Sequence, residues 1–141
     1  MTAVGPVRGA RLLLDADVLF PIRICDFILT ASTNGLFQRP IVSELILAEA
    51  IRNVTADLPD LDEARVQRRF ANVRVATDGH GIAIPRRFVD EVIVNEKDRH
   101  VVAAAIFHSV DFVVTNGRRL RREVHLLGRT ERSSPRRSFR R

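Results

Sequence analysis

The sequence predicts an α/β protein in which helices cover a short central parallel sheet. Residues 11–14 form an apolar run without alternation, which is typical of a strand buried on both faces. Residues 111–115 form a second short apolar run. Segments with helical periodicity separate the two runs, and helical connections between strands favour right-handed crossovers. We therefore expect three layers, α/β/α.

Length and composition indicate one globular domain. The chain has 141 residues, of which 45% are hydrophobic and 28% are charged. No run approaches the roughly 20 apolar residues of a membrane span. The first residues also lack a basic region followed by an apolar one, so we expect no membrane association and a cytoplasmic location. The single cysteine, Cys25, cannot form an internal disulfide and fits a core position.

The positive charge is concentrated at one end of the chain. Residues 118–141 contain ten arginines and two glutamates, a net +8 in a chain of net +6, so residues 1–117 carry a net −2. A basic tail of this kind either binds RNA or is solvated and disordered. We divide the chain into a lead-in (1–10), a domain (11–124) and a basic tail (125–141).

Two helices are predicted between residues 21 and 58. The first covers residues 21–34, with one buried face, and ends at Asn34-Gly35. The predicted face consists of Ile24, Phe27, Ile28 and Ala31. Residues 36–42 contain Pro40, so they form an edge strand at best. Ser43 then caps the second helix, whose apolar line is Ile46, Leu47, Ala50, Ile51 and Val54.

A third helix is predicted to begin at Asp60, with Glu63 completing a capping box, and to continue to about Val73. Its arginines form the basic cluster of the domain, which we interpret as a solvated face with some ion pairs; they are Arg65, Arg68, Arg69 and Arg74. A turn at residues 78–81 and a short helix or loop at 85–92 follow. His80 and His125 have no metal-ligand spacing and are interpreted as surface residues.

The last predicted helix covers residues 95–108. Its buried stripe contains Val101, Val102, Ala105 and Ile106, and Asp98 lies in its first turn. Helix capping alone can explain an acid at that position. The polar sequence Thr115-Asn116-Gly117 follows the second strand, where the end of a strand opens into a site.

Three acids on different elements are candidates for a metal site. Asp15 directly follows the first strand, Glu49 lies on the second helix and Asp98 begins the last. Ligands in open α/β sheets lie beyond the carboxyl ends of the strands, although Asp15 can also act simply as a helix cap. Carboxylates without matching His or Cys indicate Mg²⁺ or Mn²⁺, which suits phosphodiester hydrolysis.

Four stretches resemble, in order, the successive motifs of a PIN domain. They are Leu14-Asp-Ala-Asp-Val-Leu19, Val42-Ser-Glu-Leu-Ile-Leu-Ala-Glu49, Asp98-Arg-His-Val-Val-Ala-Ala-Ala105 and Asp111-Phe-Val-Val-Thr-Asn116. The resemblance is to the VapC-like toxins of bacterial toxin–antitoxin systems. It implies a compact α/β/α fold and a Mg²⁺- or Mn²⁺-dependent endoribonuclease that cleaves RNA, is inhibited by a cognate antitoxin protein and can form a homodimer.

The resemblance assigns a role to each matching residue. Asp15, Glu49 and Asp98 match the three acids, and Thr115 matches the polar residue that helps to hold the metal-bound water or the acid network. Three positions are weaker candidates for supporting roles: Glu44, Asn116 and Asp17. Asp26 and Asp111 are interpreted as structural.

The chain departs from the family pattern near its end. Gly117 occurs where many members have a fourth acid, Leu120 occurs where others have a later one, and Asn95 replaces an acid common before Asp98. An alternative hypothesis is therefore a degenerate PIN domain that binds RNA or an antitoxin without cleavage. The tail also lacks the family's last strand and helix, which suggests a domain truncated by a change of reading frame, or else a functional RNA-holding tail.

Overall fold

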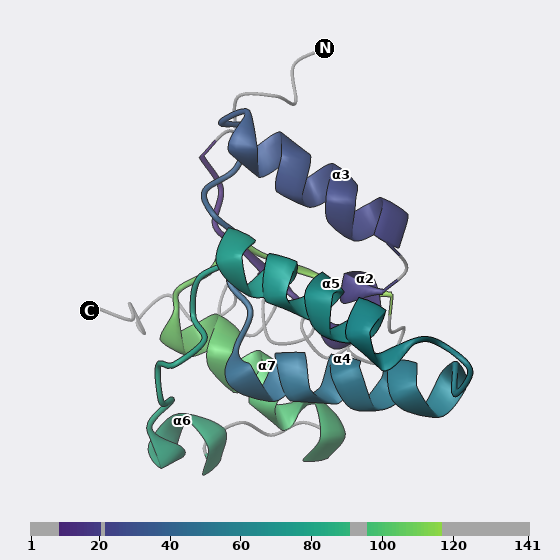
Figure 1. The fold of residues 1–141 in the computed structure, drawn as a ribbon. Coiled ribbons are helices and arrows are strands. Elements are labelled where there is room, and N and C mark those ends of the chain that lie inside the picture. Colours follow the sequence, from purple (N-terminus) through teal and green to yellow (C-terminus); the bar gives the residue numbers. More distant parts are fainter. Residues whose placement is uncertain (1–8, 21, 91–95, 117–141) are drawn as a thin grey trace, which may run out of the picture.

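The computed structural model describes residues 9–20, 22–90 and 96–116. Within these ranges the strands are β1 (Leu12–Leu14) and β2 (Phe112–Val114). The helices are α2 (Ala16–Leu19), α3 (Ile22–Thr33), α4 (Glu44–Asp57), α5 (Glu63–Ala76), α6 (Arg86–Asp90) and α7 (Glu96–Phe107) (Figure 1). The described helices thus all lie between the two strands in the chain, the strands pair in parallel, and the predicted α/β class is confirmed.

The two ends of the described chain meet in the sheet. β1 and β2 pair in parallel, with Leu12 opposite Phe112, Leu13 opposite Val113 and Leu14 opposite Val114. All three leucines of β1 are buried, as predicted for a strand covered on both faces. Because the strands are parallel, their carboxyl ends lie at the same edge, and Asp15 and Thr115 are therefore neighbours.

The sequence predicts at most an edge strand at residues 36–42, but this segment does not lie at an edge, because it is bridged on both sides at Ile41. Ile41 forms isolated bridges to Leu13 on one side and to Asp78 on the other. Its backbone N–H donates to the carbonyl of Leu12 (2.7 Å), and its carbonyl accepts from the N–H of Leu14 (3.0 Å). Pro40 is tolerated because its carbonyl still accepts a hydrogen bond, from the N–H of Asp78 (2.9 Å).

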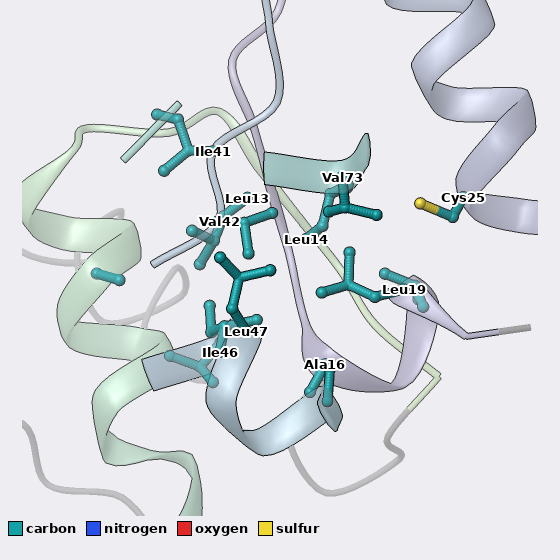
Figure 2. Close-up of a cluster of buried hydrophobic side chains, with 14 of the residues drawn as sticks. Leu13, Leu14, Ala16, Leu19, Cys25, Ile41, Val42, Ile46, Leu47 and Val73 are labelled. Atoms are coloured by element: carbon teal, nitrogen blue, oxygen red, sulfur yellow. The ribbon is translucent and has the colours of Figure 1, made fainter. Parts of the chain in front are cut away.

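The core lies around β1 and the first turns of α4 (Figure 2). Ile46 and Leu47 from α4 and Val73 from α5 are fully buried there, together with the leucines of β1. The predicted apolar line of α4 is confirmed: Ile46, Leu47, Ala50 and Val54 are buried, and Ile51 packs partly buried against them. The close approach of Gly79 to Ile41 and its φ of 97° explain the glycine at that turn.

Helix caps explain where α4 and α5 begin. The Ser43 hydroxyl accepts a hydrogen bond from the N–H of Ile46 (3.2 Å), as the sequence predicts. The prediction that Asp60 begins the next helix is wrong. Asp62 is the cap, and its carboxylate accepts from the N–H of Ala64 (3.0 Å). Asp60 remains in the turn that precedes it.

The helix α3 buries only part of the predicted face. Ile28 is buried as predicted and Ala31 is half-buried, but Ile24 is 38% exposed and Phe27 is 71% exposed. Cys25 is buried beside Ile28, so the face in contact with the core is rotated from the predicted line toward Cys25. On α7, Val101 and Val102 are buried as predicted, together with Ala103 and Ala104, whereas Ile106 is 37% exposed.

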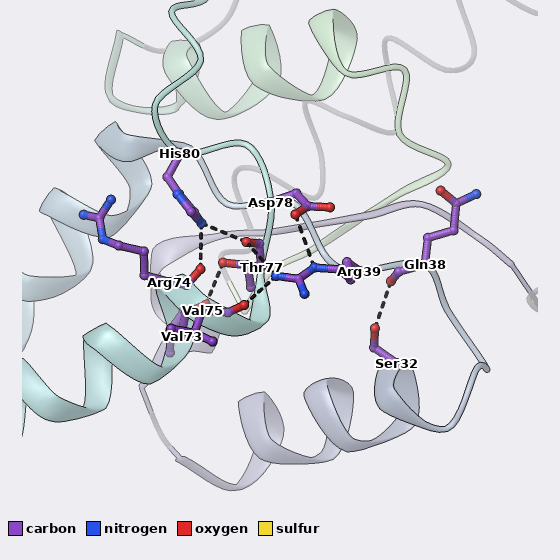
Figure 3. Close-up of polar contacts among 9 residues, drawn as sticks. All are labelled: Ser32, Gln38, Arg39, Val73, Arg74, Val75, Thr77, Asp78 and His80. Carbon is purple, nitrogen blue, oxygen red and sulfur yellow. Dashed lines mark hydrogen bonds and ion pairs between the residues drawn. The ribbon is translucent and has the colours of Figure 1, made fainter.

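Polar contacts close the carboxyl end of α5 (Figure 3). The His80 ring nitrogen Nε2 lies 2.7 Å from the carbonyl of Arg74 and 2.8 Å from that of Thr77. Arg39 pairs with Asp78 (3.2 Å) and donates to the carbonyl of Val75. His80 is therefore half-buried and bonded, which corrects its interpretation as a surface residue.

Several predictions lie outside the described residues. They concern Asn95, Gly117, Leu120, His125, the end of the predicted domain (117–124) and the basic tail (125–141). In the part of the chain that the structure describes, no helix combines the length and the apolar composition that a membrane crossing requires.

Candidate acidic site at the carboxyl ends of the strands

Asp15 lies at the carboxyl end of β1 and begins α2. One carboxylate oxygen, Oδ1, accepts a hydrogen bond from the N–H of Ala16 (2.7 Å), and the side chain is half-buried. The capping role considered from the sequence is therefore present. It occupies only one of the two carboxylate oxygens, so the cap does not exclude a second role for this side chain.

Thr115 holds the other oxygen of Asp15. The Thr115 hydroxyl Oγ1 donates to Asp15 Oδ2 over 2.8 Å, and it lies 3.4 Å from Asp17 Oδ2. The backbone N–H of Asp15 also donates to the carbonyl of Val114 (3.0 Å), which continues the pairing of the strands to this point. The carboxyl ends of the two strands thus meet, as predicted, and the side chains of Asp15 and Thr115 are in direct contact.

Asp17 and Asn116 form a second contact beside the first. The backbone N–H of Asn116 lies 3.1 Å and 3.2 Å from the two carboxylate oxygens of Asp17. The Asn116 side-chain amide donates to the Asp17 carbonyl (3.4 Å). The turn that follows β2 is therefore attached to the first turn of α2 by both backbone and side chain.

Glu49 approaches the same edge from α4. It is half-buried, and its Oε2 lies 3.0 Å from Nε2 of His100 on α7. The other ring nitrogen of His100, Nδ1, is buried without a hydrogen-bond partner among the described residues. The pair therefore connects α4 to α7 next to the strand ends.

Burial and negative neighbours change the acidity of Asp15. Burial raises the pKa of Asp15 above its ordinary value of 3.8, and the charges of Asp17 and Glu49 raise this pKa further. The hydrogen bonds from Thr115 and Ala16 act in the opposite direction without reversing the shift. Glu49 is thus near enough to Asp15 for the two carboxylates to repel each other.

Two further predicted residues lie in the first turns of α7 and α4. Asp98 lies in the first turn of α7, two residues before His100, and is half-buried. Glu44 is exposed and forms a two-point contact with the Arg74 guanidinium (2.9 Å and 2.7 Å). The hydrogen bond from Arg74 lowers the pKa of Glu44. Glu44 thus stabilises the packing of α4 against α5, and its bonding does not direct it to Asp15.

The donor set has the chemistry of a Mg²⁺ or Mn²⁺ site, but the side chains are not arranged around a common point. Carboxylate and hydroxyl oxygens are the ligands that these hard cations prefer. Among the described residues, however, no group of three or more His, Cys, Asp or Glu side chains is placed to hold a metal ion.

Two features of this edge were missed by the sequence analysis. The sequence assigns no role to His100, and its only signal is a polar ring between the charged first turn of its helix and the apolar stretch that follows. Asp17 was named as a weak candidate, but nothing in the spacing indicated that it contacts Asn116, 99 residues away.

No protein-family model, curated protein or solved structure matches the chain.

Proposed function

We propose that the chain is a divalent-metal-dependent endoribonuclease with a PIN-like, three-layer fold, and that it acts as the toxin of a toxin–antitoxin pair. One observation supports this proposal above the others. Asp15 is a half-buried carboxylate at the joint carboxyl end of two parallel strands, and burial, together with neighbouring carboxylates, raises its pKa. Such a carboxylate is stabilised by a nearby cation.

In this proposal each side chain has a separate task. Asp15, Glu49 and Asp98 would hold Mg²⁺ or Mn²⁺, and Thr115 keeps the Asp15 carboxylate oriented through its 2.8 Å hydrogen bond. Asn116, in the turn after β2, and Asp17, in the first turn of α2, support that arrangement through their mutual hydrogen bond. A cation held there would supply a lower pKa for an attacking water and stabilisation of the charge on the phosphate oxygens.

The test is cleavage of a mixed RNA substrate by the full-length chain with Mg²⁺, with Mn²⁺ and with EDTA. We expect cleavage with either cation and none with EDTA. The products should carry 5′-phosphate and 3′-hydroxyl ends, because water attacks phosphorus and the 3′ oxygen leaves. Asp15→Asn should lower the rate by at least about a hundredfold, the typical scale for loss of a group that stabilises transition-state charge.

The matched control is Asp60→Asn, which removes an exposed carboxylate from the turn before α5. It should cleave at the wild-type rate. Equal cleavage by wild type and Asp15→Asn would point to a contaminating nuclease or to different chemistry, and would contradict the proposal.

The second candidate function is a non-catalytic PIN-like module that binds RNA or an antitoxin. It is favoured by the pairing of Glu49 with His100 and by the absence, among the described residues, of a three-residue ligand group. Calorimetry with Mg²⁺ separates the two functions. Saturable binding that Asp15→Asn abolishes supports the nuclease, whereas wild type without measurable heat supports the binding module.

The proposed partners follow from the same assignment. A toxin of this class acts on RNA in the cytoplasm and is held inactive by a cognate antitoxin protein, and a homodimer is compatible with either candidate function. Co-expression with the product of a small neighbouring gene, followed by co-purification and loss of RNA cleavage, would identify the antitoxin.

A further inference from the structure

Two aspartates attach β2 to the chain around β1, one at each end of the strand pair. At the start, Asp111 Oδ2 accepts a hydrogen bond from the backbone N–H of Arg11 (2.8 Å). At the end, Asp17 accepts from the backbone N–H of Asn116 (3.1 Å). The contacts are of the same kind, but only the second lies beside Asp15.

The contact between Asp17 and Asn116 lies immediately beyond the last backbone hydrogen bond between the two strands. The N–H of Asp15 donates to the carbonyl of Val114, and beyond this bond the two segments diverge into α2 and the turn at residues 115–116. Charge-assisted bonds from a backbone N–H to a carboxylate are stronger than neutral ones. Asp17 therefore fixes the backbone immediately after Thr115.

We propose that Asp17 is a positioning residue that holds the hydroxyl of Thr115 on the carboxylate of Asp15. The Thr115 hydroxyl has a single proton, and it is 2.8 Å from Asp15 Oδ2 but 3.4 Å from Asp17 Oδ2. The short hydrogen bond of the Thr115 hydroxyl is therefore the one to Asp15. Asp17 accepts its own hydrogen bond from the adjacent backbone N–H of Asn116. The role of this arrangement in RNA cleavage rests on the proposed function, whereas the positioning itself does not.

The experiment measures amide hydrogen exchange of the full-length chain by NMR at fixed pH. The variants are Asp17→Ala, Asp17→Asn and the matched control Asp111→Ala. Asp17→Ala should make exchange at the Asn116 amide at least about tenfold faster and should shift the Thr115 side-chain resonances. Asp17→Asn keeps an acceptor oxygen and should remain within about threefold of wild type.

The control separates positioning from general stability. Asp111→Ala removes the equivalent contact at the far end of the strands, so it should leave Asn116 exchange and the Thr115 resonances unchanged. The Val42 amide, which donates to the carbonyl of Asp78 (2.8 Å), reports global unfolding in every variant. Exchange at Asn116 that accelerates only in step with Val42, or not at all, would overturn the positioning role.

Turnover of RNA by the same variants distinguishes this inference from the proposed function. Asp17→Ala should lower kcat about tenfold or more with little change in KM, Asp17→Asn should restore most of kcat, and Asp111→Ala should keep the wild-type kcat. If wild type does not cleave RNA, the proposed function fails, and the exchange data still decide the positioning role. Unchanged kcat in an active Asp17→Ala enzyme would overturn its part in cleavage.

Discussion

At the scale of single residues, the site is defined by a carboxylate kept in unfavourable surroundings. Asp15 is half-buried, and Asp17 and Glu49 add negative charge near it. Hydrogen bonds from Ala16 and Thr115 offset part of this cost but do not remove it. Surroundings that destabilise the ionised form of a carboxylate are typical of functional sites, where a side chain is kept for a reason other than stability.

We therefore predict that Asp15→Asn stabilises the protein at neutral pH without added metal. Asparagine removes the buried charge, keeps an acceptor for the N–H of Ala16 and, through its amide, still pairs with the Thr115 hydroxyl. The temperature of half-unfolding should rise by about 1–3 °C, measured by circular dichroism in EDTA. The stabilised variant should at the same time have lost RNA cleavage.

The pH dependence follows from the direction of the shift. The pKa of Asp15 is higher in the folded than in the unfolded chain, so the folded state binds the proton more tightly. Wild type should gain stability relative to Asp15→Asn as the pH falls through the raised pKa, until the pH is below the ordinary value of 3.8. A difference that is constant from pH 7 to pH 4 would contradict this account.

Sequence reasoning at this scale found the residues that follow strands and missed the side-chain pairs. Asp15 and Thr115 were predictable because parallel strands bring their carboxyl ends together. The contact of Glu49 with His100 joins α4 to α7, and it depends on the rotation of each helix about its own axis. Local spacing does not specify that rotation relative to a distant element.

At the scale of elements, short-range hydrogen bonds decide where helices begin. Ser43 and Asp62 both accept a bond from a backbone N–H in the first turn of their helix. A capping side chain satisfies a donor that has no partner within the helix. Asp60 has the residue type of a cap but lies two positions too early.

The cap assignment gives a paired prediction for α5. Asp62→Ala should lower the free energy of unfolding by about 1 kcal/mol, because the N–H of Ala64 loses its acceptor. Asp60→Ala should change it by less than about 0.5 kcal/mol. Urea unfolding followed by circular dichroism measures both. The reverse order would show that α5 begins at the capping box expected from the sequence.

The faces of helices were predicted unevenly. The buried line of α4 was correct because only one continuous apolar line exists on that helix. On α3, apolar residues cover more than one face, and Ile28 fits helical spacing both with the predicted Ile24 and with Cys25. In the fold Ile28 is buried together with Cys25, and Phe27 is 71% exposed.

At the scale of the whole molecule, stability depends on how completely the core closes around β1. Leu13 is fully buried, and its backbone bridges to Ile41 on one side and pairs with Val113 on the other. Phe27 is a larger apolar side chain, yet it contributes little buried area. Hydrophobic stabilisation scales with the area removed from water and not with residue size.

These positions give a prediction that tests the packing directly. Leu13→Ala should lower the free energy of unfolding by about 2–5 kcal/mol, the usual cost of a cavity in a closed core. Phe27→Ala should change it by less than about 0.5 kcal/mol. Chemical denaturation of both variants provides the comparison. A large loss in Phe27→Ala would mean that another surface, such as a second copy of the chain, covers α3 in solution.

The sequence alone determined the α/β class, the buried first strand, the cap at Ser43 and the position of Asp15 at a strand end. These features depend on local rules: apolar runs, helical periodicity and the hydrogen-bonding needs of a few neighbouring residues. Only the tertiary structure decided that Asp17 reaches Asn116, that Glu49 contacts His100 and that α3 turns Phe27 outward. Each of these depends on the rotation and distance between segments far apart in the chain, which is set by the packing of the whole core.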